Sequence, residues 1–189
     1  GFAVVVGVFT VEVKVDNDML GSFKPSSQIR LRSTRLHNDL AGAQTFFIRI
    51  SSGLENAFKQ PENLKQIQEL QNYMESMGVF DKTVSLADQI SLIHREMNDG
   101  DPGFYKVPDA PGLIPQYLLF LHRDDIKRYV TPDFSEVNIL VRHNIISSSE
   151  LNQVLGKIER YMKGNINEYF RFGITGENIL INKAADSMA

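Results

Sequence analysis

The residues that could do chemistry in this chain are few and stand far apart in the sequence. None of the four histidines has a second histidine at the spacing typical of a metal site; they are His37, His94, His122 and His143. The chain contains no cysteine, which excludes disulfides, thiolate metal ligands and cysteine nucleophiles. We therefore expect no metal site, and we expect the histidines to be polar surface residues.

The short motifs that resemble catalytic or phosphate-binding loops are incomplete. His122-Arg123-Asp124 matches the start of a protein-kinase catalytic loop, but the downstream Asn, a glycine-rich loop and the Asp-Phe-Gly motif are missing. Gly173-Ile-Thr-Gly176 lacks the Lys-Ser/Thr pair of a phosphate loop and is typical of a turn that ends a strand. No serine stands in the glycine-flanked elbow of a serine hydrolase. The sequence predicts no catalytic residue, no cofactor and no enzymatic activity.

One segment points to binding instead of catalysis. Between positions 104 and 120, aromatic and aliphatic residues gather beside a stretch rich in proline and glycine. Ligand sites are mostly apolar clefts at the junctions of secondary-structure elements. The candidate substrate-binding residues are Phe104, Tyr105, Leu113, Tyr117 and Phe120. The alternative is that these residues simply close the core of the domain.

Length and composition indicate a folded protein. The 189 residues suit one domain or two small ones, and 42% are hydrophobic and 23% charged, as in ordinary globular domains. The formal net charge of −3 argues against a nucleic-acid partner, because such proteins usually carry a basic face.

Periodicity predicts the elements that would position the candidate site. Strands are expected over 45–51, 79–84, 137–142 and 169–174, and helices over 61–77, 85–97 and 147–162. Pro61 opens the first helix, Gly78 ends it, and Ser85 with Asp88 forms a capping box for the second. Breakers fill 99–112, after which 113–121 is apolar nearly all round and predicts a helix buried on more than one face. A charged helical segment is expected over 122–129, before Pro132.

This order predicts an α+β fold of the ferredoxin-like, split βαβ type. Two βαβ units would form a domain over 45–175, with a helical insertion between them at about 99–130. A faint internal repeat supports the prediction, because the helical residues Ile67, Leu70, Tyr73 and Met74 match four residues one constant offset later. Those four are Leu155, Ile158, Tyr161 and Met162.

The two ends of the chain have a different character. Residues 1–10 are apolar without periodicity and fall short of the roughly 18–20 residues that a membrane-spanning helix needs. They predict either an N-terminal strand or the outer end of a membrane helix that begins upstream. Residues 11–44 form a connecting segment with one amphipathic helix over 28–40.

Several stretches in order resemble a known family. They are Val15-Asp-Asn-Asp18 with Phe23, Leu40-Ala-Gly42, Ser85-Leu-Ala-Asp88 and Pro115-Gln-Tyr-Leu-Leu119, followed by Tyr129-Val130, Asp133 and Asn138-Ile-Leu-Val-Arg142. Together they make the chain similar to the extracytoplasmic porter loop of the resistance–nodulation–division superfamily. The similarity is to the branch of hydrophobe and lipid exporters that includes the mycobacterial large membrane proteins.

The resemblance implies a function that composition does not. The chain would be a periplasmic domain of an inner-membrane, proton-driven exporter, and would form part of the conduit for a hydrophobic or lipid substrate. Residues 1–10 would end one membrane helix, and 176–189 would lead to the next. Its partners would be the substrate, the rest of the same transporter chain and further copies in a homo-oligomer. The ionisable residues that couple transport to protons would lie in membrane helices outside this chain.

A second hypothesis comes from a different class of protein. A stand-alone soluble regulatory domain of ferredoxin-like fold, binding a small polar ligand, would have the same pattern of elements. Residues 1–15 would then be an ordinary strand, and the loop glycines would matter more than the aromatic residues.

Overall fold

The computed structural model describes residues 44–176. The expectations for 1–10, for the amphipathic helix over 28–40, for His37 and for the segment after position 176 lie outside the described residues. Within them, the elements follow one another in the order β1 (Gln44–Ser51), α2 (Pro61–Ser76), β2 (Lys82–Val84), α3 (Leu86–Glu96), α4 (Leu113–Tyr117), α5 (Arg123–Ile126), β3 (Glu136–His143), α6 (Ser148–Asn165) and β4 (Arg171–Thr175). Short 3₁₀ turns lie at Ala57–Lys59, Pro102–Phe104 and Leu118–Phe120.

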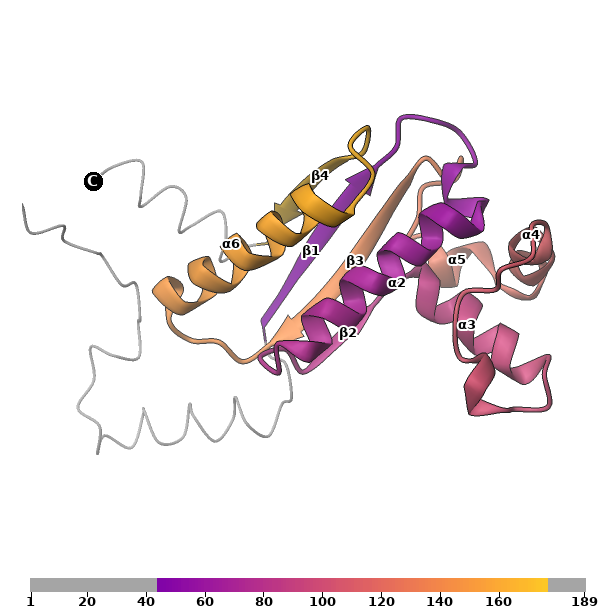
Figure 1. The fold of residues 1–189 in the computed structure, drawn as a ribbon, viewed down its shortest axis with the longest axis horizontal. Coiled ribbons are helices and arrows are strands. Elements are labelled where there is room, and N and C mark those ends of the chain that lie inside the picture. Colours follow the sequence, from indigo (N-terminus) through magenta and orange to yellow (C-terminus); the bar gives the residue numbers. More distant parts are fainter. Residues whose placement is uncertain (1–43, 177–189) are drawn as a thin grey trace, which may run out of the picture.

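The four strands form one antiparallel sheet in the order β2-β3-β1-β4. The connection from β1 through α2 reaches β2 by passing over β3, and the connection from β3 through α6 reaches β4 by passing over β1. Helices α2 and α6 lie across the same face of this sheet (Figure 1). The predicted α+β class is confirmed at this level.

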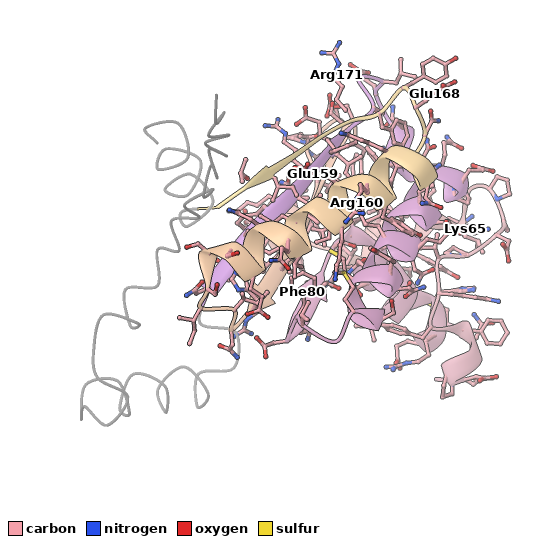
Figure 2. The ribbon with its side chains drawn as sticks, turned by 60° about the vertical axis from the view of Figure 1, so that its left-hand side comes forward. Lys65, Phe80, Glu159, Arg160, Glu168 and Arg171 are labelled. Atoms are coloured by element: carbon pink, nitrogen blue, oxygen red, sulfur yellow. The ribbon has the colours of Figure 1, made fainter. Side chains whose placement is uncertain are left out.

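The core lies between that face and the two helices. Strand β1 points Phe46, Ile48 and Ile50 inward, and β3 does the same with every second residue, so that Ile48 pairs with Ile139 at the sheet centre. Helices α2 and α6 contribute buried residues at helical spacing: Leu64, Ile67, Leu70, Met74, Leu155, Ile158 and Met162. The opposite side of α6 is polar, and the exposed Arg160 lies on it (Figure 2). The residues that the apolar periodicity of the sequence predicts to face inward are therefore the ones that form the core.

The predicted helix ends are confirmed. Pro61 is the first residue of α2, and Gly78 follows that helix with a φ of +65°, a conformation that glycine adopts without steric cost. The Ser85 side chain accepts from the backbone N–H groups that begin α3, and Asp88 accepts from the backbone N–H of Ser85 at 2.7 Å. Both halves of the capping box are thus present.

Three predicted elements differ from the structure. The helix expected over 113–121 ends at Tyr117 and continues as a 3₁₀ turn, and Leu119 and Phe120 are 84% and 62% exposed. The prediction that this helix is buried on more than one face is therefore wrong, because α4 lies at the far end of the molecule from the sheet (Figure 1). The charged helix over 122–129 is only the single turn of α5, and the strand over 79–84 pairs only from Lys82.

The helices of residues 44–176 are too short or too polar to cross a bilayer.

Candidate functional site

The five candidate residues all lie in the insertion between β2 and β3, but they have different environments. Tyr117 is buried and Leu113 is half-buried, whereas Phe104, Tyr105 and Phe120 are exposed by 36%, 45% and 62%. Leu113 packs against the edge of the main core. No ring contact joins Phe120 to Phe104, Tyr105 or Tyr117, and the five residues differ in exposure.

Phe104 and Tyr117 meet at a residue that the sequence did not single out for this role. The ring of His94 on α3 lies 5.5 Å from that of Phe104, edge to face, and 5.8 Å from that of Tyr117. Its Nδ1 lies 2.9 Å from the Tyr117 hydroxyl. Asn98 completes the group, because its side-chain amide donates to the His94 carbonyl at 2.7 Å and approaches Nδ1 at 3.4 Å. We call His94, Asn98, Phe104 and Tyr117 the α3–α4 cluster.

The expectation that the histidines are surface residues is wrong for two of them. His94 is 8% exposed and His143 is 1% exposed, while His122 is exposed as predicted. Each buried ring has a hydrogen-bonding partner: Tyr117 for His94, and for His143 the backbone N–H of Ile145, which donates to its Nδ1 at 3.2 Å. A single histidine in an amphipathic helix gives the same sequence pattern whether other elements cover it or solvent does. Its burial therefore depends on the tertiary packing, which the sequence pattern does not show.

Burial sets the charge state of the α3–α4 cluster. It lowers the pKa of His94 below its ordinary value, the positive charge of Lys106 lowers it further, and Asp109 opposes the shift. The lowered pKa favours the neutral ring, and Nδ1 shares a hydrogen bond with the Tyr117 hydroxyl. The Tyr–His pair then acts as a polar tie between α3 and α4, inside an otherwise apolar contact.

Tyr105 contacts Arg95, the residue that follows His94 in α3. The guanidinium of Arg95, which also pairs with Glu96, lies 5.7 Å from the centre of the Tyr105 ring. Partial burial raises the pKa of the Tyr105 hydroxyl, and the carboxylate of Asp88 raises it further against the opposing charge of Arg95. Tyr105 is thus a neutral, half-exposed aromatic group.

The segment between β2 and β3, which consists of α3 and the insertion, presents much of the exposed apolar surface of the described residues. Six of their nine exposed large hydrophobic side chains lie between positions 92 and 120: Leu92, Met97, Phe104, Tyr105, Leu119 and Phe120. Exposed apolar side chains that are concentrated in one segment of the fold indicate a candidate interaction site. In residues 44–176, no group of histidine, aspartate and glutamate side chains is placed to hold a metal ion. The arrangement suits contact with an apolar molecule.

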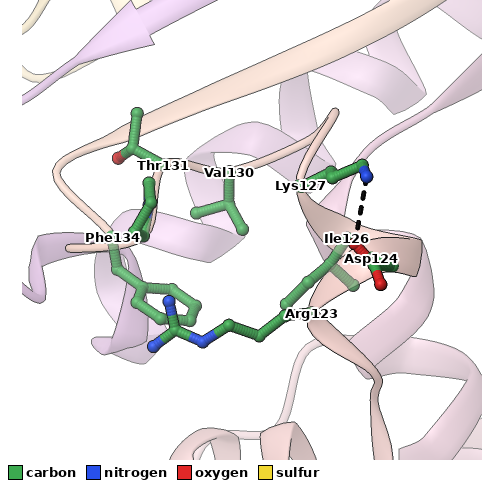
Figure 3. Close-up of a pocket in the computed structure, with 8 residues that line it drawn as sticks. Arg123, Asp124, Ile126, Lys127, Val130, Thr131 and Phe134 are labelled. Atoms are coloured by element: carbon green, nitrogen blue, oxygen red, sulfur yellow. Dashed lines mark hydrogen bonds and ion pairs between the residues drawn. The ribbon is translucent and has the colours of Figure 1, made fainter.

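A second feature was missed by the sequence analysis. A hollow of about 100 Å³ lies between α5 and the loop that enters β3 (Figure 3). We call it the α5–β3 hollow; its walls include Arg123, Asp124, Ile126, Lys127, Val130 and Phe134. Arg123 and Lys127 stand one helical turn apart, and this spacing is the only signal of the hollow in the sequence.

The loop beside this hollow contains part of the pattern on which the family resemblance depends. The backbone N–H of Asn138 donates to the Tyr129 carbonyl at 2.8 Å, and Val130 forms a bridge with Val137. The Asp133 carboxylate accepts from Thr131 at 2.6 Å and from Ser135 at 2.9 Å. The Thr131 hydroxyl is the main reason that the pKa of Asp133 is lowered. These residues therefore fix the turn into β3.

Comparison of the chain with protein-family models, with curated proteins and with solved structures gives no match.

Proposed function

We propose that this chain is an extracytoplasmic domain of a proton-driven exporter and forms part of the conduit for a hydrophobic or lipid substrate. The family resemblance of the sequence motivates the proposal. The strand order β2-β3-β1-β4, with two crossovers that each pass over one strand, supports the ferredoxin-like, porter-type fold that this function expects. Because one fold serves many functions, the fold alone does not carry the proposal.

The observation that carries it is the exposed apolar surface of the insertion. Leu119 and Phe120 follow α4 directly and are 84% and 62% exposed, although both side chains would be more stable away from water. An apolar substrate that covered them would gain about 25 cal/mol for each Å² of apolar surface removed from water. In this proposal, the substrate contacts Leu119 and Phe120, and Phe104 and Tyr105 are further points of contact along its path.

A second apolar feature supports contact with the rest of the transporter. On the sheet face that points away from α2 and α6, Phe47 pairs with Leu140 and Leu140 pairs with Val84, which makes one row across three strands. All three side chains are half-buried. We propose that another domain of the same transporter chain packs on this row.

The proposal is tested by the binding of an apolar fluorescent probe, 1-N-phenylnaphthylamine, to the whole chain. Leu119→Ser with Phe120→Ser removes apolar surface from the insertion, and we expect the probe to bind about tenfold more weakly, since tenfold corresponds to about 1.4 kcal/mol. The matched control is Leu54→Ser with Tyr169→Ser, because these residues are 69% and 79% exposed but lie outside the insertion.

Equal loss in both double variants would contradict the proposed surface. The cellular side of the proposal is tested by fractionation of the native host. Recovery of the chain within a larger membrane protein is the expected result. Recovery in the soluble fraction as a short chain would favour the stand-alone regulatory domain instead.

A further inference from the structure

The α5–β3 hollow is separate from the exposed apolar surface of the insertion and has a different chemistry. Its inner walls are apolar and buried. Ile126, Val130 and Phe134 are 6%, 4% and 8% exposed, and the Ile126 carbonyl accepts from the backbone N–H groups of Tyr129 and Val130 at 2.8 and 3.1 Å. Buried apolar side chains on a hydrogen-bonded backbone form an apolar recess of the kind in which ligands bind.

The rim of the hollow carries the opposite kind of group. Arg123 and Lys127 extend from α5, and Asp124 lies between them in sequence (Figure 3). The Lys127 ammonium pairs with the Asp124 carboxylate at 3.0 Å, in a contact whose side chains are 71% and 89% exposed. Among the residues that the structure describes, the Arg123 guanidinium makes no hydrogen bond or ion pair. Arg123 is therefore the cation at this rim that is available to a ligand.

Phe134 provides the wall that faces Arg123. In Figure 3 the Arg123 side chain extends along the hollow toward the Phe134 ring. The other neighbour of that ring is also a cation, since the Lys59 ammonium lies 4.4 Å from the ring centre. The Asp133 carboxylate accepts from the hydroxyls of Thr131 and Ser135 and forms no ion pair with Lys59 or Arg123.

Phe134 has a backbone conformation that is unfavourable for its side chain. Its φ is +57°, a conformation that a bulky side chain rarely adopts. The residue is fixed on both sides, because its N–H donates to the Thr131 carbonyl at 3.0 Å and its carbonyl accepts from Phe58 at 3.1 Å. A strained residue that lines a cavity is a reason to look for a ligand there.

We propose that the α5–β3 hollow binds a small monocarboxylate that carries one aromatic ring or a short alkyl chain. The apolar part lies among Ile126, Val130 and Phe134, and the carboxylate pairs with the Arg123 guanidinium, which matches a carboxylate with two parallel hydrogen bonds. The volume of about 100 Å³ sets the size limit. An apolar cavity of roughly 150 Å³ holds benzene, so the hollow accepts a group of about one ring only if the ring remains partly exposed at the rim.

The test uses benzoate as the probe and benzamide as its neutral counterpart, with the whole 189-residue chain. Binding is measured by titration calorimetry, and the site is located by amide chemical shifts. We expect benzoate to bind at least tenfold more tightly than benzamide, with shifts at positions 123–134. Arg123→Gln should remove that preference and leave the benzamide affinity unchanged.

The matched control is Arg128→Gln, because Arg128 is also exposed and basic and lies in the same segment, but it does not line the hollow. It should keep the full preference for benzoate. Because Arg123 is exposed, its replacement should leave the thermal midpoint unchanged, which separates loss of binding from loss of folding. Equal affinities for the two probes, equal effects of the two variants, or shifts confined to another part of the domain would each overturn the proposal.

Discussion

The ring of Tyr73 stacks on the ring of Tyr161, with centroids 4.0 Å apart and planes 10° from parallel. Tyr73 lies on α2 and Tyr161 on α6, so the stack joins the two helices that cover the sheet (Figure 1). The two tyrosines also occupy matching places in the internal repeat, in which Leu70 and Met74 correspond to Ile158 and Met162. The repeat thus has a structural consequence: equivalent faces of the two helices meet.

The stack should contribute a measurable coupling energy. We expect Tyr73→Leu and Tyr161→Leu to show a coupling of about 0.5–1.5 kcal/mol in a double-mutant cycle, because leucine keeps the apolar burial and loses the ring contact. The measurement is the free energy of unfolding in urea. The control pair is Tyr73→Leu with Tyr169→Leu, since Tyr169 is 79% exposed. Coupling no larger than in the control pair would contradict the role of the stack.

Ser85→Ala should destabilise the domain more than the equivalent change at the other serine cap. Ser85 is fully buried; its hydroxyl donates to the Gln71 side chain at 2.7 Å and accepts from the backbone of Ala87 at 3.0 Å. Alanine leaves a buried amide oxygen without its donor, so we expect a loss of about 2 kcal/mol. Ser147→Ala, at the more accessible start of α6, should cost about 1 kcal/mol. Equal losses by chemical denaturation would contradict this account of Gln71.

Stability should decrease in mild acid because of His94. Its pKa is lowered in the folded state, mainly by burial, so the unfolded chain takes up the proton more readily. The stabilising contribution is present above the ordinary histidine pKa of about 6.5 and is lost as the pH falls through the lower folded value. Thermal unfolding between pH 7 and pH 5 measures the slope. His94→Gln should flatten it, whereas His122→Gln, at an exposed position, should leave it unchanged. An unchanged slope in His94→Gln would contradict the prediction.

Gly176, which directly follows β4, should tolerate no side chain, in contrast to Gly173 within that strand. A Cβ at Gly176 would lie 2.8 Å from the Cβ of Phe46 and 3.2 Å from its Cα, whereas a Cβ at Gly173 would meet open space. We expect Gly176→Ala to cost about 1–3 kcal/mol of unfolding free energy through overpacking. Gly173→Ala should change stability by less than about 0.5 kcal/mol. Similar values for the two variants would show that the end of β4 moves away from β1 without penalty.

The sequence could predict the elements and their order because local rules govern them. The spacing of Leu64, Ile67 and Leu70 and the capping box at Ser85 depend on neighbours within one or two turns, and the structure has both. The α+β class follows from the order of the elements. The register of the pairing, such as Phe46 with Val141, depends on the packing of the whole chain, and only the structure gives it.

The candidate site was less predictable because apolar character alone does not distinguish a core residue from an exposed one. Tyr117 and Phe120 are three positions apart in one apolar stretch, yet the first is 7% and the second 62% exposed. His94 had no signal of burial, since its tie to Tyr117 joins residues 23 positions apart. The hollow depends on a loop in which Phe134 has a positive φ and faces α5. No sequence pattern predicts a positive φ at a phenylalanine.

The most direct test of the proposed conduit is photo-crosslinking at Phe120 in the native host. Phe120 is replaced by p-benzoylphenylalanine, the cells are irradiated, and the mass of the peptide that contains the site is measured. The same replacement at the exposed Tyr169 is the control. The proposed function predicts a lipid or other apolar small-molecule adduct at position 120 and little at position 169. Equal adducts at both positions, or no small-molecule adduct at position 120, would contradict it.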